Sequence, residues 1–342
     1  QDFLNALQWD GTERIRFCLH RFLGSDTDDY TYEALKLFLL GAISRAFKPG
    51  CKFEVMLCLV GGQGAGKSSF FRLLAVNDDW FSDDLKKLDD ENVYRKMQGH
   101  WIIEMSEMIA TANAKSIEEI KSFLSRQKET YKIPYETHPA DRKRQCVFGG
   151  SSNTLDFLPL DRTGNRRFVP VMVYPERAEV HILADEQASR EYINQMWAEA
   201  MEIYRSGNFR LRFSPAMNDY LKAHQKDFMP EDTKAGQILD YLERYSGSMV
   251  CSKQLYKEAL GHDYDEPKQW ELREINDIMN NAVTGWRAFS NPRYFPEPYR
   301  RQKGWERIRN DNEPDNSMDG FQEIPTEEME QLGLPEEWLK QK

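Results

Sequence analysis

The sequence has few of the features that are typical of secreted proteins, of proteins with structural zinc sites or of membrane proteins. Its five cysteines are scattered and form no Cys-x-x-Cys pair, which argues against a zinc ribbon or disulfide scaffold and favours a reducing cytoplasm. The longest uncharged apolar run, Val55 to Gly66, has twelve residues, fewer than the ~20 of a membrane span. No signal peptide or internal repeat is evident. We expect a cytoplasmic protein without membrane contact and, because it begins at Gln1 and not Met, a portion of a longer chain.

Charge is distributed unevenly along the 342 residues. The net charge is −10, but residues 311–342 hold ten acids and two lysines, so eight of those negative charges lie in the last 32 positions. The first 310 residues have 44 basic and 46 acidic side chains. The acidic balance is therefore a property of the tail, and it does not argue against a nucleic-acid partner.

Hydrophobic periodicity divides the chain into four parts. Apolar residues recur every three or four positions through 33–47, which predicts a helix. Continuous apolar runs at 53–60, 101–103, 146–148 and 168–173 predict strands of an α/β core. Three further helical patterns and a Gly/Pro/aromatic segment follow a polar linker at 226–235, in the order of a winged helix. We expect an N-terminal helical region (1–48), a P-loop domain (49–225), a winged-helix-like domain (235–308) and a loosely attached acidic tail (309–342).

A phosphate-binding loop is the strongest motif. Residues 61–68 match G-x-x-x-x-G-K-[ST] in full, after a predicted strand and before a helix-compatible stretch. Backbone N–H groups of such a loop surround nucleotide phosphates, Lys67 would reach the β- and γ-phosphates, and the Ser68 hydroxyl would ligate Mg²⁺. The alternative is a chance glycine-rich turn. The residues predicted to bind ATP are Gly61, Gly62, Gln63, Gly64, Ala65, Gly66, Lys67, Ser68 and Ser69.

A Walker-type ATPase also needs an acid at the end of a second strand. Glu104 ends the run Trp101–Ile103 and would hold Mg²⁺, and Glu107 could orient the attacking water; two solvated acids are the alternative. Asn153, after a third strand, could contact the γ-phosphate or simply form a turn. Arg166 and Arg167 precede a fourth strand and could supply a cation to the γ-phosphate, or could form surface salt bridges.

Several ordered motifs resemble the virulence-associated protein E family. They cover residues 3–215 and comprise Trp9-Asp10-Gly11, Pro49 to Phe53, the P-loop, Asp79 to Asp83, Trp101 to Glu104, Pro134-Tyr135, Arg144 to Phe148 and Thr163 to Phe168. Members are similar to superfamily 3 helicases, a branch of the AAA+ ATPases of phages and mobile elements. The resemblance implies a ring, expected to be a hexamer, with ATP between subunits and DNA in the pore.

The resemblance also implies roles for individual residues. Lys67 and Ser68 fall in Walker A, Glu104 and Glu107 in Walker B, Asn153 at sensor 1, and Arg166 or Arg167 at an arginine finger acting in trans. One departure is that Met105 follows Glu104, where superfamily 3 helicases often have a second acid; another is Tyr131-Lys132 in place of Tyr-Arg. Longer relatives often carry a primase, so a primase in cis or in trans is a possible partner.

A basic stretch lies where superfamily 3 helicases place their pore hairpin. Residues 121–144 hold seven basic side chains against three acids, with tyrosines between them. Lys and Arg neutralise phosphates, and aromatic rings stack on bases. Together they are typical of sites that bind single-stranded nucleic acid. A solvated basic loop is the alternative. The predicted DNA-binding residues are Lys128, Tyr131, Lys132, Tyr135, Arg142, Lys143 and Arg144.

The sequence as a whole favours an ATP-dependent DNA helicase or translocase, with ATP and Mg²⁺, single-stranded or forked DNA and further copies of itself as ligands and partners. One alternative is a ring ATPase that loads or remodels DNA without unwinding it. Another is a site-specific replication initiator that uses ATP as an assembly switch. The third helix of the proposed winged helix carries Glu271, Glu274 and Asp277 against Arg273 alone, so we expect DNA contact, if any, through its basic flap.

Overall fold

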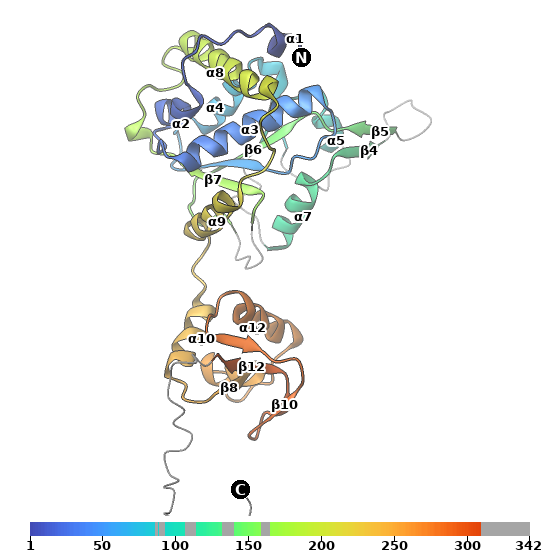
Figure 1. Cartoon of the computed structure of the whole chain (residues 1–342), viewed down its shortest axis with the longest axis vertical. Helices are drawn as coiled ribbons and strands as arrows, with labels where there is room; N and C mark the ends of the chain where they lie inside the picture. The colour runs from blue at the N-terminus through green and yellow to red at the C-terminus, as the bar shows by residue number, and fades with distance from the viewer. Residues whose placement is uncertain (86–87, 89–92, 107–113, 132–139, 159–164, 309–342) are drawn as a thin grey trace, which may run out of the picture. The chain divides into compact units, whose positions relative to one another are not determined.

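The computed structural model describes residues 1–85, 88, 93–106, 114–131, 140–158 and 165–308 (Figure 1). Two compact units divide the chain, Gln1–Thr233 and Lys234–Lys342. Each has its own hydrophobic core. The expected acidic tail, 309–342, lies outside the described residues.

A five-stranded parallel sheet forms the centre of the first unit, so the predicted α/β fold is confirmed. Its strand order is β2 (Phe81–Ser82), β3 (Ile102–Met105), β6 (Val147–Ser152), β1 (Met56–Val60) and β7 (Phe168–Met172). Every residue of β1 is buried, as a near-continuous apolar run requires in a strand covered on both faces. β6 lies between β1 and β3, so the strand before the P-loop and the strand that carries Glu104 are not neighbours.

Helices cover both faces of this sheet. On one face lie α1 (Asp2–Ala6), α2 (Ile15–Leu23), α3 (Asp29–Phe47), α4 (Lys67–Leu74) and α8 (Glu186–Ser206), which share one core with alternate residues of the strands (Figure 1). On the other lie α5 (Val93–Lys96), α7 (Ala114–Leu124) and η3 (Gln225–Phe228). The N-terminal helices, expected as a separate region, are thus part of the first unit because their apolar faces complete its core.

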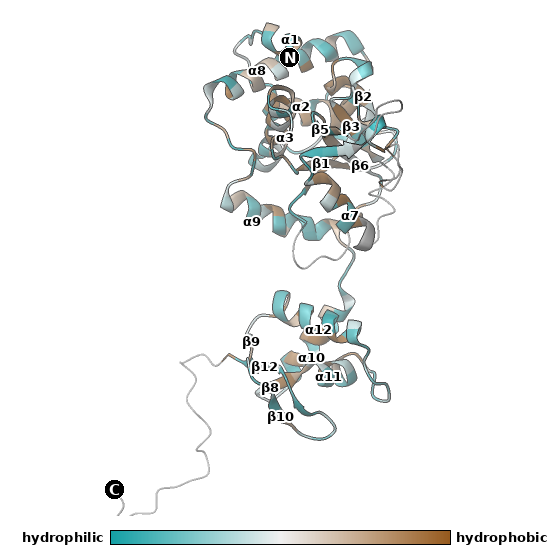
Figure 2. Cartoon of the chain, turned by 90° about the vertical axis from the view of Figure 1, so that its right-hand side faces the viewer, coloured by the Kyte–Doolittle hydropathy of each residue, from teal (hydrophilic) through white to brown (hydrophobic). Residues whose placement is uncertain are grey.

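After α8 the first unit continues with a separate helix and a short helical turn. The chain breaks after α8, and α9 (Pro215–His224) begins at the cap Ser214, whose hydroxyl accepts the N–H of Met217. Figure 2 shows α9 as largely hydrophilic, in keeping with Leu221 as its buried residue. The expected linker then begins with η3, where Phe228 is buried, so the first unit extends beyond the predicted boundary at 225.

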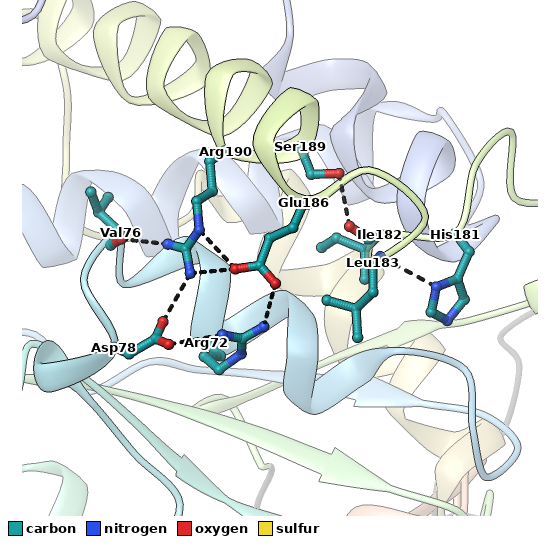
Figure 3. A network of polar contacts seen from close by, with 9 residues as sticks. All are labelled: Arg72, Val76, Asp78, His181, Ile182, Leu183, Glu186, Ser189 and Arg190. Carbon is teal, nitrogen blue, oxygen red and sulfur yellow. Dashed lines mark hydrogen bonds and ion pairs between the residues drawn. The ribbon is translucent and has the colours of Figure 1, made fainter.

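Long-range polar contacts tie α8 to the helices beside it. Two ion pairs lie at its start (Figure 3). Arg190 pairs with Asp78 of η1 (Asp78–Trp80) at 2.9 Å, and Glu186 pairs with Arg72 in the last turn of α4 at 3.0 Å. Further along α8, Glu199 is only 5% exposed and accepts the backbone N–H groups of Arg14 at 2.6 Å and Ile15 at 2.9 Å. The carboxylate therefore caps the N-terminus of α2, where orphan N–H groups need an acceptor.

The second unit is a small α/β body. In chain order it has α10 (Thr233–Arg244), β8 (Met249–Cys251), α11 (Ser252–Gln254) with the π-helical turn η4 (Leu255–Ala259), α12 (Gln269–Asn281), β9 (Trp286–Ala288), β10 (Arg293–Phe295), β11 (Arg300–Gln302) and β12 (Gly304–Arg307). β12 pairs antiparallel with β8 and with β9. The strands β10 and β11, which lie between β9 and β12 in the chain, pair with each other as a hairpin. The helices and the strands after α12 follow the order that the sequence analysis expected, whereas β8, between α10 and α11, was not predicted; the winged-helix assignment stays a prediction.

Replacing the buried cap should loosen the N-terminal helices. We expect Glu199→Ala to lower the free energy of unfolding by about 2–3 kcal/mol, because two backbone N–H groups lose a charged acceptor and a buried side chain is removed. The matched control is Glu202→Ala on the same helix, whose i,i+3 pair with Arg205 is exposed and should contribute under about 1 kcal/mol. Thermal unfolding followed by circular dichroism measures both. Equal melting temperatures for the two variants would contradict the capping role.

Candidate nucleotide-binding site

The predicted P-loop turns between the buried strand β1 and helix α4. Gly64 and Gly66 have φ of +81° and +80°, a region that favours glycine, and Gly66 is the N-cap of α4. The first turn of α4 contains no acid, and its N-cap has no side chain. The N–H groups at this helix end are therefore free of a competing side-chain acceptor from the cap, as an anion site requires.

Lys67 lies folded against the loop and is 7% exposed. Its Nζ donates to the carbonyl oxygens of Gly61 and Gly62, both at 2.7 Å, and to Asn153 Oδ1 at 3.0 Å. Burial lowers the pKa of the Lys67 ammonium, and the charge of Glu104 acts in the opposite direction. Because its three hydrogen-bonded acceptors are all neutral, the ammonium keeps its charge available for a phosphate.

Glu104 lies at the centre of the site, between α4 and β6. Its Oε1 accepts the hydroxyls of Ser68 at 2.8 Å and Ser151 at 2.5 Å, and the side chain is 0% exposed. Burial raises the pKa of this carboxyl, and the two hydroxyls lower it. Its second oxygen, Oε2, is buried and has no hydrogen-bond partner in the described part of the chain.

These residues suit a magnesium ion carried in with a nucleotide. A hydroxyl and a carboxylate are the hard oxygen donors that Mg²⁺ prefers, and the orphan Oε2 needs a partner. Among the described residues, no group of three His, Cys, Asp or Glu side chains could hold a metal alone. The protein would thus supply one or two ligands, and phosphate and water oxygens would supply the rest. Ser68 and Glu104 are the residues predicted for this role.

The parallel sheet explains why residues far apart in sequence meet here. Glu104 pairs with Gly149 and Val60 with Ser152, so β1, β3 and β6 end at the same edge of the sheet. Asn153 follows β6 at that edge, beside the P-loop. The sequence analysis did not single out Ser151, although a hydroxyl in a strand with every residue buried needs a partner and could have indicated one.

The arginines predicted to reach the γ-phosphate lie at the opposite edge. Arg166 is 68% exposed and pairs with Glu54 at 3.0 Å, and Arg167 Nε donates to Ser125 at 2.9 Å. Both precede β7, whose first residue aligns with the start of β1. The five residues of β1, about 17 Å of strand, separate them from the P-loop of their own chain.

The predicted DNA-contacting segment contains an antiparallel hairpin. β4 (Lys128–Tyr131) pairs with β5 (Ala140–Lys143), with Lys128 opposite Lys143. Lys143 is exposed, and Lys128 pairs with Asp141. The site residues Glu107, Lys132 and Tyr135 lie outside the described residues, so their predicted roles stay predictions.

Arg144 corrects one prediction. It is 3% exposed, donates to the carbonyl oxygen of Phe123 at 2.7 Å, forms a buried ion pair with Glu129 and lies over the Phe123 ring at 4.6 Å. Because these partners enclose its guanidinium, Arg144 has no exposed group that could contact DNA. We therefore remove Arg144 from the predicted DNA-binding set and assign it to the base of the hairpin.

Comparison with known proteins identifies the family. Residues 4–230 match the virulence-associated protein E-like domain. The chain belongs to this family. The match covers the whole sheet and every described residue of the P-loop site, so the resemblance seen in the sequence motifs is confirmed.

The fold of this virulence-associated protein E-like chain is also similar to solved structures. Two apo structures of the NrS-1 C-terminal region match with TM-scores of 0.51 and 0.54, each at 13% identity, over 90% of this chain and 78% of the other. At this identity the likeness concerns the fold alone. No curated protein sequence matches the chain. In the described ranges, no helix has the length and apolar character that a membrane crossing requires.

Lys143, which ends β5, and Arg144, which follows it, should respond differently to truncation. We expect Arg144→Ala to lower the free energy of unfolding by about 3–5 kcal/mol, because Glu129 would remain buried after losing its shorter ion pair, with Arg126 at 3.7 Å as its other cation. Lys143→Ala, one residue earlier and exposed, should change it by less than about 0.5 kcal/mol. Urea unfolding gives both values. A fully stable Arg144→Ala would show that the buried pair contributes nothing and would return this arginine to the set of DNA candidates.

Proposed function

We propose that this protein is an ATP-dependent DNA helicase or translocase of a phage or mobile element, which hydrolyses ATP between the subunits of a ring. The observation that carries the proposal is the group formed by Lys67, Ser68, Glu104 and Asn153 at the carboxyl edge of the sheet. The family match and the five-stranded parallel sheet support it. The AAA+ and superfamily 3 assignments are part of this proposal.

The proposed chemistry follows from the geometry of the P-loop. Phosphate oxygens would replace the carbonyl and amide oxygens that hold Lys67, and the loop N–H groups and the N-terminus of α4 would bind the remaining oxygens. Mg²⁺, when bound, would neutralise charge on the β- and γ-phosphates beside Ser68 and Glu104. Asn153 would orient the γ-phosphate or the attacking water. Glu107 is the residue that the sequence predicts as a candidate to orient that water.

Hydrolysis by this arrangement requires a second subunit. Arg166 lines a cleft of about 940 Å³ at the edge of the sheet opposite the P-loop. The same cleft has four further cations, Lys52, Arg210, Arg212 and Lys222, and none of these four has a hydrogen bond or ion pair with another described residue. We propose that this basic cleft faces the nucleotide of a neighbouring subunit, and that Arg166, more exposed than Arg167, is the finger.

The hairpin β4–β5 is the proposed DNA contact within the ring. Lys128 and Lys143 lie directly opposite each other; Lys128 pairs with Asp141, whereas Lys143 is exposed, so two neighbouring cations with one acid between them would favour a further anion. Single-stranded or forked DNA would supply that anion. The second unit, as a winged-helix-like domain, would add non-specific contacts through the hairpin β10–β11, where Tyr294 and the Arg300 side chain are exposed. A primase, in cis or in trans, remains a proposed partner.

Mixing two inactive variants tests the shared active site. We expect Lys67→Ala and Arg166→Ala each to abolish ATP hydrolysis while folding normally, because one removes the phosphate ligand and the other the trans cation, which is worth about 10³–10⁵ in rate. Mixed before assembly, they form some interfaces with both groups intact, so the ATPase rate should partly return. Arg177→Ala, which breaks a surface ion pair with Asp26, is the control and should hydrolyse normally. Mixed oligomers without any activity would exclude Arg166 as the finger.

Salt dependence tests the hairpin. We expect Lys128→Ala with Lys143→Ala to weaken single-stranded DNA binding at every sequence and to reduce the log–log salt slope by ~0.7 for each lost phosphate contact. Lys36→Ala, in an i,i+3 pair with Glu33 on α3, should leave the slope unchanged. Fluorescence anisotropy at several salt concentrations measures it. Strand displacement on a forked duplex then separates unwinding from loading or remodelling, and tight binding to one duplex sequence would indicate an initiator instead.

A further inference from the structure

The strand that carries Glu104 offers no second acid in its described part. Oε1 of Glu104 is occupied by two hydroxyls, and Oε2 is buried next to the proposed metal position. A carboxylate that holds a cation does not readily take up a proton as well. The next residue, Met105, is fully buried in the core on the other face of the sheet. Among the described residues, an acceptor for the proton of the attacking water must therefore come from another element.

The neighbouring strand β2 ends beside Glu104. Phe81 pairs with Ile102 and Ser82 with Ile103, so the next position in register with Glu104 is Asp83. Successive side chains of a strand alternate between faces. Phe81 and Ile102 contact the core on the face of the sheet that holds α4. Glu104, two positions after Ile102 in β3, lies on the same face. Asp83 is the first residue after β2, and continuing the alternation of that strand by one residue would place its side chain on this face as well.

Asp83 is also available for chemistry. It is exposed, and it has no hydrogen bond or ion pair with another described residue, whereas the adjacent Asp84 pairs with Lys96 at 3.2 Å. Its negative charge acts on Glu104 and contributes to the raised pKa of that carboxyl. The backbone N–H of Asp84 bonds the Ser82 hydroxyl at 3.3 Å, which turns the chain at the end of β2 and sets Asp83 at the carboxyl edge, the edge at which the P-loop lies.

We propose that Asp83 is the general base for ATP hydrolysis and supplies, from the adjacent strand, the second acid that β3 lacks. This inference rests on the proposed function. As the water oxygen forms its bond to the γ-phosphorus, the Asp83 carboxylate takes one proton from that water, and the bond from phosphorus to the bridging oxygen of ADP breaks. The products are ADP and inorganic phosphate, and Asp83, which is exposed, then releases the proton to solvent.

The test compares Asp83→Asn with Asp84→Asn and Glu107→Gln. We expect Asp83→Asn to lower kcat about 100-fold or more, with unchanged affinity for a fluorescent ATP analogue at saturating Mg²⁺ and an unchanged Mg²⁺ dependence of that affinity. After incubation with ATP, rapid filtration should recover ATP from this variant and ADP from the wild type. Asp84→Asn should behave as the wild type in each measurement, because the lost ion pair is on the surface.

Two outcomes would overturn the assignment. Normal turnover by Asp83→Asn would remove Asp83 from the mechanism. A weaker Mg²⁺-dependent nucleotide affinity would make it a metal-site residue and not a base. In the first case, loss of turnover in Glu107→Gln would identify Glu107 as the base. Wild-type protein that binds ATP without hydrolysing it, even assembled on DNA, would instead overturn the proposed function itself.

Discussion

The buried carboxylate of Glu104 is the interaction on which the site depends. It joins three elements that are distant in sequence, because Ser68 comes from α4, Ser151 from β6 and Glu104 itself from β3. An ionised carboxylate without its hydrogen-bond partners would cost several kcal/mol to bury, so the hydroxyls and the acid are required together. The P-loop helix is thereby tied to the sheet at the point where a phosphate and its cation would lie.

A second constraint is the direction of the strands. In a parallel sheet all carboxyl ends share one edge, so the P-loop, Glu104, Asp83 and Asn153 can meet there. The arginines before β7 and the basic cleft around them must then lie at the other edge. Arg166 cannot reach the P-loop of its own chain unless the sheet between them, and with it the hydrophobic core, is disrupted. A proposed catalytic role for Arg166 thus requires a second copy of the chain, and a ring of such copies is part of our proposal.

Much of the fold could be predicted because its signals are local. The apolar run of β1, the glycines of the P-loop and the acid at the end of β3 stand in positions that their own chemistry requires. The hairpin and the N-terminal helices could not be placed in this way. α2 is capped by Glu199, some 185 residues later, and no local pattern indicates a partner at that separation. Arg144 belongs to a basic stretch in the sequence, yet the fold encloses it.

By itself, the sequence determined the strands β1, β3, β6 and β7 and the phosphate site, because a strand, a glycine-rich turn and a helix N-terminus are made from consecutive residues. The tertiary structure alone decided which of several similar charged side chains are buried and paired and which are exposed. Glu104 and Arg144 are buried, whereas Asp83, Lys143 and Arg166 are exposed. Burial and pairing depend on which strands are neighbours, and strand order arises from contacts between segments far apart in the chain, which residue spacing does not encode.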